Sequence, residues 1–461
     1  MTTVNKIAFI LMFVLLGFTT MAYGGVHQPV IAIFYVGVAL MMVLYAVDGF
    51  RSGTLRYSPS LLQLPLYATA IYSLVQIIPF GSIADVAGVT GIVRTISLDP
   101  FSTKLTAAHF FALAVFFSLS LILIDSSKRI RIAVLFITVF GFAFAFFAIL
   151  QSVLSPTLIY GIYETQFAQP FGSFVNRHNF AAYMEMCIAI PLGLLFTGVI
   201  SKDKRLLYIT GVALMGVALL LSGSRGGFVA LVAQLIFLVL ITVGNRSRKN
   251  YAVKFALAGV LIAAIVGGSF FVGGESSLTR ISESATSKDV TTNRSHIWMV
   301  TAKVIAANLP FGAGFGAYGV AYTQYDTFSG LERVEQAHND YLQVLADGGL
   351  VGLAIGGAFL FFLFQTGRKA VSVENFYRRG VAVGAASGIF AVLVHSIFDF
   401  VLHTTAISLM FILLLCLLVA AGIAYKDEIQ TEMEKHKPLH KKRRSSTVTP
   451  FEQKALTEER S

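Results

Sequence analysis

A histidine and two arginines in this chain have side chains that suit acid–base chemistry beside a phosphate. His338 lies in the segment A-H-N-D-Y at the foot of an apolar stretch, and an imidazole with a pKa of about 6.5 can accept a proton at neutral pH. Arg225 lies among small residues in S-G-S-R-G-G, and Arg294 precedes Trp298, the single Trp, by four residues. Small neighbours let a bulky anion approach a guanidinium and the N–H groups at a helix start. These residues predict a site that binds phosphate and moves a proton.

A second polar cluster, N-R-H-N at residues 176–179, lies just before another apolar stretch. Its side chains could hydrogen-bond to sugar hydroxyls or to phosphate. Capping of a helix by Asn179, with solvation of the loop, explains the same residues and is the more common role. The candidate substrate-binding residues are Asn176, Arg177, His178, Asn179, Asn339 and Trp298.

Signatures of cofactor and metal sites are weak in this chain. Residues 314–319 match G-x-G-x-x-G, but the residues around Pro310 before them do not form a strand pattern, and no βαβ unit follows. The acidic residues have no metal-ligand spacing. Cys187 and Cys416 both lie inside apolar stretches and form no disulfide framework. We therefore expect neither a metal nor a cofactor.

The composition indicates the class of protein that must position these residues. Of 461 residues, 56% are hydrophobic and 13% are charged, whereas soluble domains have about 45–50% apolar and about 25% charged residues. The formal net charge is +11, but Lys and Arg occur in short clusters between long apolar stretches. A nucleic-acid-binding protein would instead gather them on one face. We predict an all-α polytopic membrane protein that does not bind nucleic acid.

The apolar stretches predict about twelve transmembrane helices, since a helix needs about 20 residues to cross the hydrocarbon core. They cover residues 7–23, 30–47, 61–80, 105–124, 132–154, 180–200, 206–221, 227–243, 253–272, 350–364, 381–402 and 404–424. We interpret the first as a retained helix rather than a signal peptide. One large outward loop, about 273–349, is predicted to contain short helices, and a loop that long is usually functional.

The chain divides into four predicted regions. Residues 1–175 hold the first five spans, 176–352 hold the motifs and the large loop, 350–424 hold the last three spans, and 425–461 form a basic tail. The tail is predicted to be disordered, and it is interpreted as an anchor on anionic lipid.

Lys and Arg alternate between the loops in a way that predicts the orientation. Each even-numbered loop carries two to four of them, whereas the short odd-numbered loops carry none to two. Basic loops stay on the cytoplasmic side, so both termini are predicted to be cytoplasmic, and His338, Arg225 and Arg294 to face outward. A lone loop histidine is more often structural, and Arg225 alone fits a tight turn that extends toward lipid headgroups equally well. The presence of both arginines on the same side favours a functional His338.

Three polar residues recur four apart inside the predicted eleventh span. His395, Asp399 and His403 would lie on one face of a helix over 381–402. Such a stripe faces the interior of a membrane bundle, either as a clasp between helices or as part of a cavity floor. We favour the clasp.

Four segments together resemble the O-antigen ligase/polymerase superfamily. They are S-G-S-R-G-G at 222–227, Arg294 with Trp298, N-L-P-F-G-A-G-F-G-A-Y at 308–318, and A-H-N-D-Y-L-Q-V-L-A-D-G-G-L-V-G at 337–352. The resemblance covers residues 176–352 and extends to the arrangement of one large periplasmic loop near the C-terminal third. Asp347 stands where the family more often has Glu, so the carboxylate is kept.

This resemblance implies a metal-independent glycosyltransferase in a bacterial inner membrane that acts on the periplasmic side. The implied donor is a glycan on undecaprenyl diphosphate, and the acceptor is a growing glycan or lipid A core, in surface polysaccharide assembly. His338 would take the proton of the acceptor hydroxyl, while Arg225 and Arg294 would bind the departing diphosphate.

Other functions are compatible with parts of the pattern. A protein O-oligosaccharyltransferase would share the donor chemistry, and nothing in the sequence discriminates between the acceptors. A flippase for lipid-linked sugars is disfavoured, because transporters commonly have two related halves and a midplane site, whereas this chain has no internal repeat. A scaffold would leave the His338, Arg225 and Arg294 set without a purpose.

Overall fold

A computed structural model of the chain describes residues 2–82, 91, 93–165, 168–242, 248–273, 294–327 and 334–423. Within these ranges the regular structure is helical except for one short antiparallel pair, β1 (Leu158–Ile159) and β2 (Tyr163–Glu164). The predicted all-α polytopic fold is confirmed. The predicted basic tail and residues 274–293 of the large loop lie outside the described residues, and the four-region division stays a prediction.

Nine helices in the described part of the chain are long and apolar enough to cross a membrane. They are α1 (Thr3–Met21), α2 (Gln28–Ser52), α4 (Pro100–Leu123), α5 (Ser127–Leu154), α6 (Arg177–Phe196), α7 (Lys202–Leu221), α8 (Arg225–Thr242), α13 (Asp340–Val371) and α14 (Phe376–His395). The number twelve is not confirmed, because α3 (Leu64–Gln76) and α15 (Thr405–Ala421) are shorter. An apolar helix, α9 (Arg248–Gly273), corresponds to the ninth predicted stretch.

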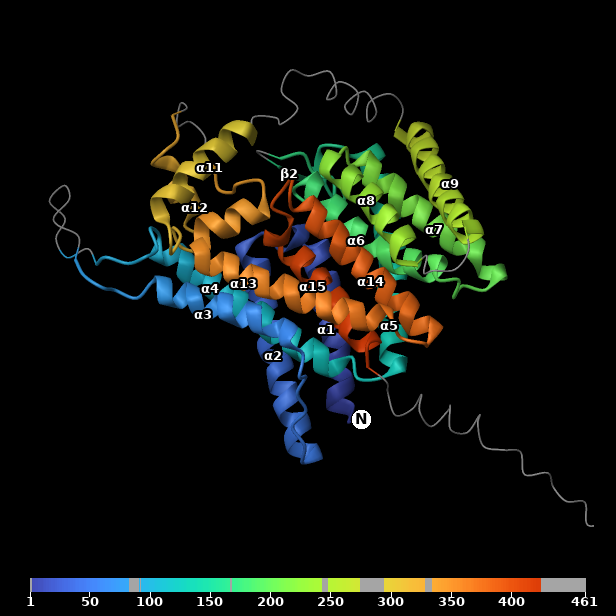
Figure 1. Cartoon of the computed structure of the whole chain (residues 1–461), viewed down its shortest axis with the longest axis horizontal. Helices are drawn as coiled ribbons and strands as arrows, with labels where there is room; N and C mark the ends of the chain where they lie inside the picture. Colours follow the sequence, from blue (N-terminus) through green and yellow to red (C-terminus); the bar gives the residue numbers. More distant parts are fainter. Residues whose placement is uncertain are drawn as a thin grey trace, which may run out of the picture. The chain divides into compact units, whose positions relative to one another are not determined.

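The large loop contains short helices, as predicted. Two helices pack beside the start of α13, namely α11 (Arg294–Asn308) and α12 (Tyr318–Thr323). Short 3-10 turns occur at η1 (Tyr23–Gly25), η2 (Leu61–Gln63) and η3 (Val401–His403). In Figure 1, α11 and α12 lie at the end of the helices opposite to the labelled N-terminus.

Helix α6 lies in the centre of the helices, and its apolar window is fully buried. It packs against α14 with backbone contact, because a Cβ added to Gly193 would lie 2.3 Å from the Gly384 nitrogen. Small residues at such crossings let two helix backbones approach closely. Polar side chains on α6, including Glu185 and Asn179, are therefore enclosed by other helices.

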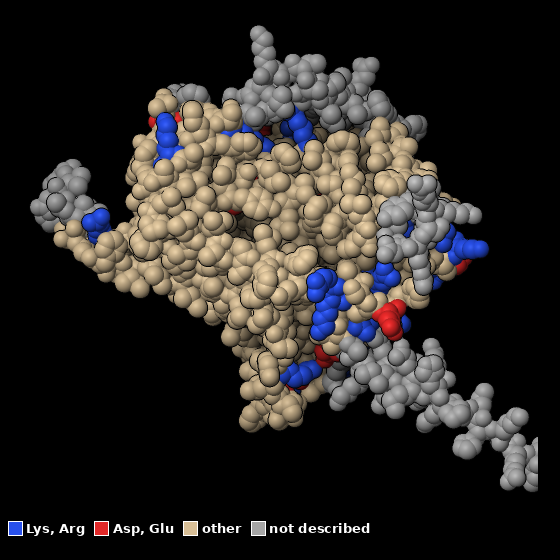
Figure 2. Space-filling model, viewed as in Figure 1, with Lys and Arg blue, Asp and Glu red and all other residues tan. Residues whose placement is uncertain are grey.

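The basic loops gather at the end of the helices that carries the N-terminus. Arg56 forms ion pairs of 2.7 Å with Asp48 and 2.8 Å with Asp125, which joins two of these loops. The guanidinium of Arg131 lies 5.5 Å from the ring centroid of Tyr377, at the start of α14. Figure 2 shows Lys and Arg toward both ends of the face in view, with a broad, nearly uncharged band between them. This band has the composition that contact with hydrocarbon requires.

Helix α13 is broken at Gly349, where φ is +58° and ψ is −148°. This backbone region is essentially restricted to glycine. A Cβ at Gly349 would also lie 2.2 Å from the Pro310 oxygen, which accepts a hydrogen bond from Leu350 N at 2.8 Å. The break therefore holds the glycine-rich turn after α11 against α13, and the continuous apolar part of α13 begins at Leu350, as predicted.

We predict that Gly349→Ala destabilises the protein by about 1–3 kcal/mol, because the new methyl group forces a strained φ and meets backbone. Thermal unfolding in lipid nanodiscs measures the change. The control is Gly357→Ala, later in the same helix, where nothing lies within 4 Å of an added Cβ; it should be neutral or stabilising. Equal melting temperatures for the two variants would contradict the prediction.

Candidate functional site

Asp399 is the centre of a polar cluster that contains three of the predicted residues. It follows α14 in a turn and is only 1% exposed. His338 Nδ1 lies 3.1 Å from Asp399 Oδ1, and Arg294 Nη2 donates to Asp399 Oδ2 at 3.1 Å. His178 Nδ1 lies 4.0 Å from the same Oδ2. One buried carboxylate thus brings together three segments that are far apart in the sequence.

The surroundings keep Asp399 ionised. Burial raises the pKa of a carboxyl group, but the hydrogen bond from His338 and the positive charges around it hold the pKa of Asp399 well below its usual range. An ionised carboxylate only accepts hydrogen bonds. The proton in the His338–Asp399 bond therefore belongs to Nδ1, which leaves Nε2 of a neutral His338 as the proton acceptor.

The backbone of His338 is held on both sides. Trp298 Nε1 donates to the Ala337 oxygen at 3.1 Å. Asn339 caps α13, where its Oδ1 accepts from the N–H groups of Tyr341 and Leu342 at 3.0 Å each. His338 itself has φ +50°, a conformation that non-glycine residues adopt rarely and only when neighbours impose it. The indole N–H of Trp298 and the amide of Asn339 thus position His338.

The turn that carries Asp399 is bound through its backbone by two other segments, the start of α13 and the start of α11. Asp340 N donates to the Ser396 oxygen at 2.9 Å, and Asn339 Nδ2 donates to the Ile397 oxygen at 2.9 Å. Arg294 Nη1 donates to the Phe398 oxygen. Three successive carbonyls therefore accept from outside the helix instead of from residues four positions later, and α14 ends at His395.

The predicted stripe of His395, Asp399 and His403 on one helical face is consequently wrong. The three side chains lie on a helix end, a turn and η3, respectively. His395 Nδ1 lies 2.8 Å from Glu185 Oε1 on α6, and His403 Nδ1 lies 3.1 Å from Asp340 Oδ1 at the start of α13. Each residue connects a different pair of segments.

Arg225 is the first residue of α8 and is partly buried. The residue before it, Ser224, has its Oγ 2.9 Å from His178 Nδ1 and accepts from Gly227 N at 3.1 Å. The glycine-rich turn is therefore tied to the Asp399 cluster through His178. Gly223 lies beside Arg177, since a Cβ added there would be 3.5 Å from Arg177 Nη1.

The other residues of the N-R-H-N cluster differ from the expected capping. Asn176 is the N-cap of α6, where its Oδ1 accepts from His178 N at 2.9 Å. Asn179 lies inside the first turn of the helix, is buried, and donates through Nδ2 to Thr404 Oγ1 at 2.7 Å. Arg177 Nη1 donates to Gln169 Oε1 at 2.5 Å. Only His178 of these four reaches Asp399, whereas Asn179 reaches the cavity described next.

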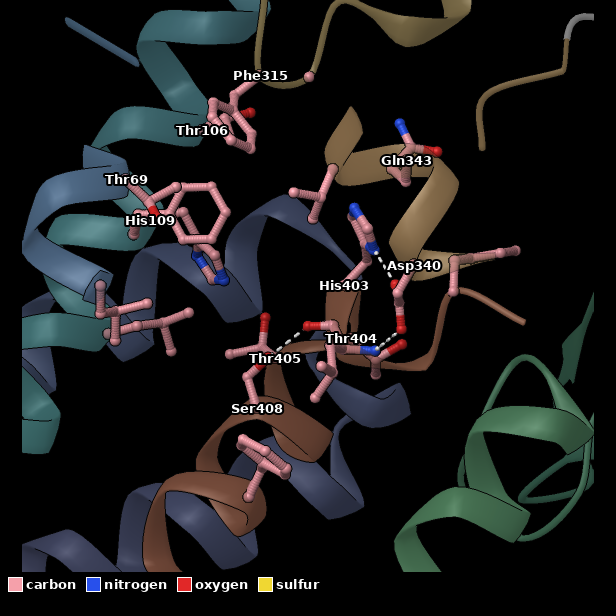
Figure 3. Close-up of a pocket in the computed structure, with 18 of the residues that line it drawn as sticks. Thr69, Thr106, His109, Phe315, Asp340, Gln343, His403, Thr404, Thr405 and Ser408 are labelled. Carbon is pink, nitrogen blue, oxygen red and sulfur yellow. Dashed lines mark hydrogen bonds and ion pairs between the residues drawn. The ribbon is translucent and has the colours of Figure 1, made fainter. Parts of the chain in front are cut away.

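A cavity of about 630 Å³ lies beside the cluster, between α2, α3, α4, α13 and α15. Most of its lining side chains are apolar. Figure 3 shows a polar wall with Asp340, Gln343, His403 and Thr404, and His109 on the opposite wall. Among the described residues that line it, none is Lys or Arg.

Phe400 separates the cavity from the Asp399 cluster. Its ring packs edge-on against His338, with centroids 4.9 Å apart, and against His403, with centroids 6.2 Å apart. Burial disfavours the charged form of His403, but the hydrogen bond and charge of Asp340 outweigh it and raise the pKa of His403 above its usual value. The two His–carboxylate pairs thus lie on either side of one aromatic ring.

Comparison with known families identifies the segment that carries much of this site. Residues 210–357 match the family model described as O-Antigen ligase. This match supports the resemblance of the chain to the O-antigen ligase/polymerase superfamily. The matched segment includes Arg225, Arg294 and His338, whereas His178 and Asp399 lie outside it. No curated protein matches the chain.

Asp399 is the site residue that sequence reasoning assigned to another role. Its 61-residue separation from His338 carries no local signal, and the four-residue spacing pointed to a helix face instead. The usable signal was the acidic residue itself, since an acid in an apolar stretch needs a partner. In the described part of the chain, no group of three or more His, Cys, Asp and Glu side chains could hold a metal ion.

We predict that Asn339→Ala loosens both the start of α13 and the turn that carries Asp399, because one side chain caps the helix and binds the Ile397 oxygen. Loss of a cap costs about 0.5–2 kcal/mol. Hydrogen exchange should accelerate at residues 341–342 and in the 396–399 turn.

The matched control for this change is Asn375→Ala, which removes the N-cap of α14, where Asn375 Oδ1 accepts from Arg378 N at 3.1 Å. It should accelerate exchange at the start of α14 and leave residues 396–399 unchanged. Unchanged exchange at 396–399 in Asn339→Ala would contradict the positioning role.

Proposed function

We propose that the protein transfers a glycan from a polyprenyl diphosphate, of the undecaprenyl class, to an acceptor hydroxyl. The observation that carries this proposal is that His338 and Arg294 bind the two oxygens of the same ionised carboxylate, that of Asp399. The match of residues 210–357 to the O-antigen ligase family model supports the class of reaction. The reaction belongs to surface polysaccharide assembly, with a glycan or lipid A core as the acceptor.

His338 acts as the general base in this proposal. Asp399 accepts a hydrogen bond from Nδ1–H at 3.1 Å, which orients the ring and selects the tautomer whose Nε2 has the lone pair. Nε2 takes the proton of the acceptor hydroxyl as its oxygen attacks the anomeric carbon. Asp399 also stabilises the imidazolium that forms, since its negative charge is already in place.

The arginines stabilise the leaving group. As the bond between the anomeric carbon and the diphosphate breaks, negative charge grows on the departing oxygen. Arg294 is held in the cluster by Asp399 and the Phe398 oxygen, so its charge needs no rearrangement during the reaction. Arg225 starts α8, where the backbone N–H groups add a favourable site for phosphate. A single displacement of this kind inverts the anomeric centre.

The charge distribution supports the side of the membrane on which we propose that the reaction occurs. The basic loops lie at the end of the helices away from α11 and α12, and such loops remain cytoplasmic. The proposal therefore has both termini in the cytoplasm and the Asp399 cluster on the periplasmic side of the inner membrane. Nucleotide sugars are absent there, so the donor must carry its own activated diphosphate.

We predict that His338→Ala and Arg294→Ala each lower glycan transfer by about 10²- to 10⁴-fold, and that Arg225→Ala also lowers it. The assay uses purified protein in liposomes with a defined undecaprenyl-diphosphate glycan and offers glycan and lipid A core acceptors separately. Arg205→Ala, in a basic loop, is the control and should transfer at the wild-type rate.

Near-wild-type transfer in the His338 or Arg294 variant would remove that residue from the mechanism. Product with only one of the two acceptors would identify the subclass of ligase or polymerase. Movement of the donor across the bilayer without transfer would instead support the flippase, and transfer to a protein acceptor alone would support an oligosaccharyltransferase.

We predict that Asp399→Asn lowers kcat by about 100-fold or more, because an amide no longer enforces the His338 tautomer. The KM for the donor should change little, since the arginines remain. The control is Asp203→Asn, at an exposed acid in a basic loop. A loss confined to KM, with kcat unchanged, would show that Asp399 acts in donor binding instead.

A further inference from the structure

The cavity beside Phe400 has a chemistry different from that of the Asp399 cluster. We propose, resting on the proposed function, that this cavity binds the acceptor and that the acceptor is an amphiphile with an uncharged, hydroxyl-rich head group, in preference to the phosphate-bearing lipid A core. The anionic diphosphate of the donor is excluded from it and stays on the arginine side of Phe400.

The size and walls of the cavity suit the hydrocarbon part of an amphiphile. Its volume of about 630 Å³ is within the usual range for a pocket that encloses a small organic ligand, about 300–1,000 Å³. Apolar side chains from five helices line most of it, among them Leu66, Leu113 and Phe359. Alkyl groups bound there lose contact with water, which favours binding.

The charge of the lining disfavours an anion. Three carboxyl residues, Glu335, Asp340 and Asp347, line the cavity. The described lining contains no Lys or Arg, and protonation of His403 offsets only Asp340, its ion-pair partner. A phosphate near these carboxyl groups would be repelled most strongly in the low-dielectric interior. Arg294, which suits a phosphate, lies in the Asp399 cluster instead.

The hydrogen-bonding groups at the polar end call for a ligand that donates. Asn179 Oδ1 and Asp347 Oδ1 are buried and have no hydrogen-bond partner among the described residues. Asn179 is 5% exposed and Asp347 is 3% exposed, and both residues line the cavity. A buried acceptor without a partner costs about 1–3 kcal/mol. A sugar hydroxyl can donate to such oxygens, whereas an ionised phosphate has no proton to give.

The ring of Phe400 lies between the polar end of the cavity and the proposed base, His338. Figure 3 shows His403 and Asp340 on the wall of the cavity, and Phe400 packs between His403 and His338. A head group bound at this end can present a hydroxyl to His338 Nε2 past Phe400. In that step the acceptor O–H gives its proton to Nε2, the oxygen bonds to the anomeric carbon, and the electron pair of the broken bond leaves with the diphosphate.

The test compares two photoreactive probes with the same alkyl chain, one with a maltose head and one with a phosphate head. The full chain is reconstituted in lipid nanodiscs free of glycoside detergent, and the labelled peptides are mapped by mass spectrometry. We expect the maltoside probe to label residues of α4 and α13 that line the cavity, and the phosphate probe to label them at least about tenfold less. Unlabelled alkyl maltoside should compete.

Two neighbouring glycines provide a matched pair of variants. Gly356 lines the cavity and Gly357 is not among its described lining residues, while neither has an atom within 4 Å of an added Cβ. Gly356→Leu should fill the cavity and abolish maltoside labelling, whereas Gly357→Leu should keep it. Asp347→Asn should lower the ratio of maltoside labelling to phosphate labelling in the cavity, because it removes a carboxyl group from the lining.

Equal or stronger labelling of the cavity by the phosphate probe would overturn the proposal. Maltoside labelling that survives in Gly356→Leu would overturn it as well. The readout needs no transfer, so His338→Ala should label like the wild type. The cavity assignment and the proposed function can therefore fail independently.

Discussion

The buried charge of Asp399 is the constraint on which the arrangement of the site depends. A carboxylate taken out of water loses hydration worth several kcal/mol, and only opposite charge and hydrogen bonds in good geometry compensate for the loss. Asp399 obtains them from His338 at the foot of α13 and Arg294 at the start of α11, and His178 at the start of α6 lies 4.0 Å away. Pairing this one carboxylate brings together segments that have no local reason to meet.

The turn that carries Asp399 also separates the two chemical environments of the site. Its carbonyls accept hydrogen bonds from Asp340, Asn339 and Arg294, so α14 stops at His395 and the chain reverses toward η3. Phe400 then lies between an arginine-containing cluster and a cavity lined by carboxyl and apolar groups. In the proposed reaction, the anionic leaving group and the hydroxyl-bearing acceptor would need these opposite surroundings, which a single turn separates.

Much of the fold could be predicted from the sequence, because a chain that crosses hydrocarbon must satisfy its backbone hydrogen bonds internally, which helices do. Long apolar stretches between basic loops predicted helices, and each stretch overlaps one. The prediction was weakest where a polar residue interrupts such a stretch. His395, Asp399 and His403 are spaced as on a helix, yet hydrogen bonds from other segments end the helix after the first of them. Residue spacing alone does not reveal which backbone carbonyls accept hydrogen bonds from donors outside the helix.

His338, Arg225 and Arg294 could be selected from the sequence by chemical type, since a proton acceptor and anion-binding groups are recognisable without coordinates. The roles of Trp298 and Asn339 in positioning His338, and the pairing of Asp399 with it, required the tertiary structure. The physical reason is that composition and periodicity indicate only whether each segment, and each of its faces, prefers water or an apolar environment. A buried charge, in contrast, is stabilised by whichever groups the folded chain places within about 3 Å of it, and those groups are distant in sequence.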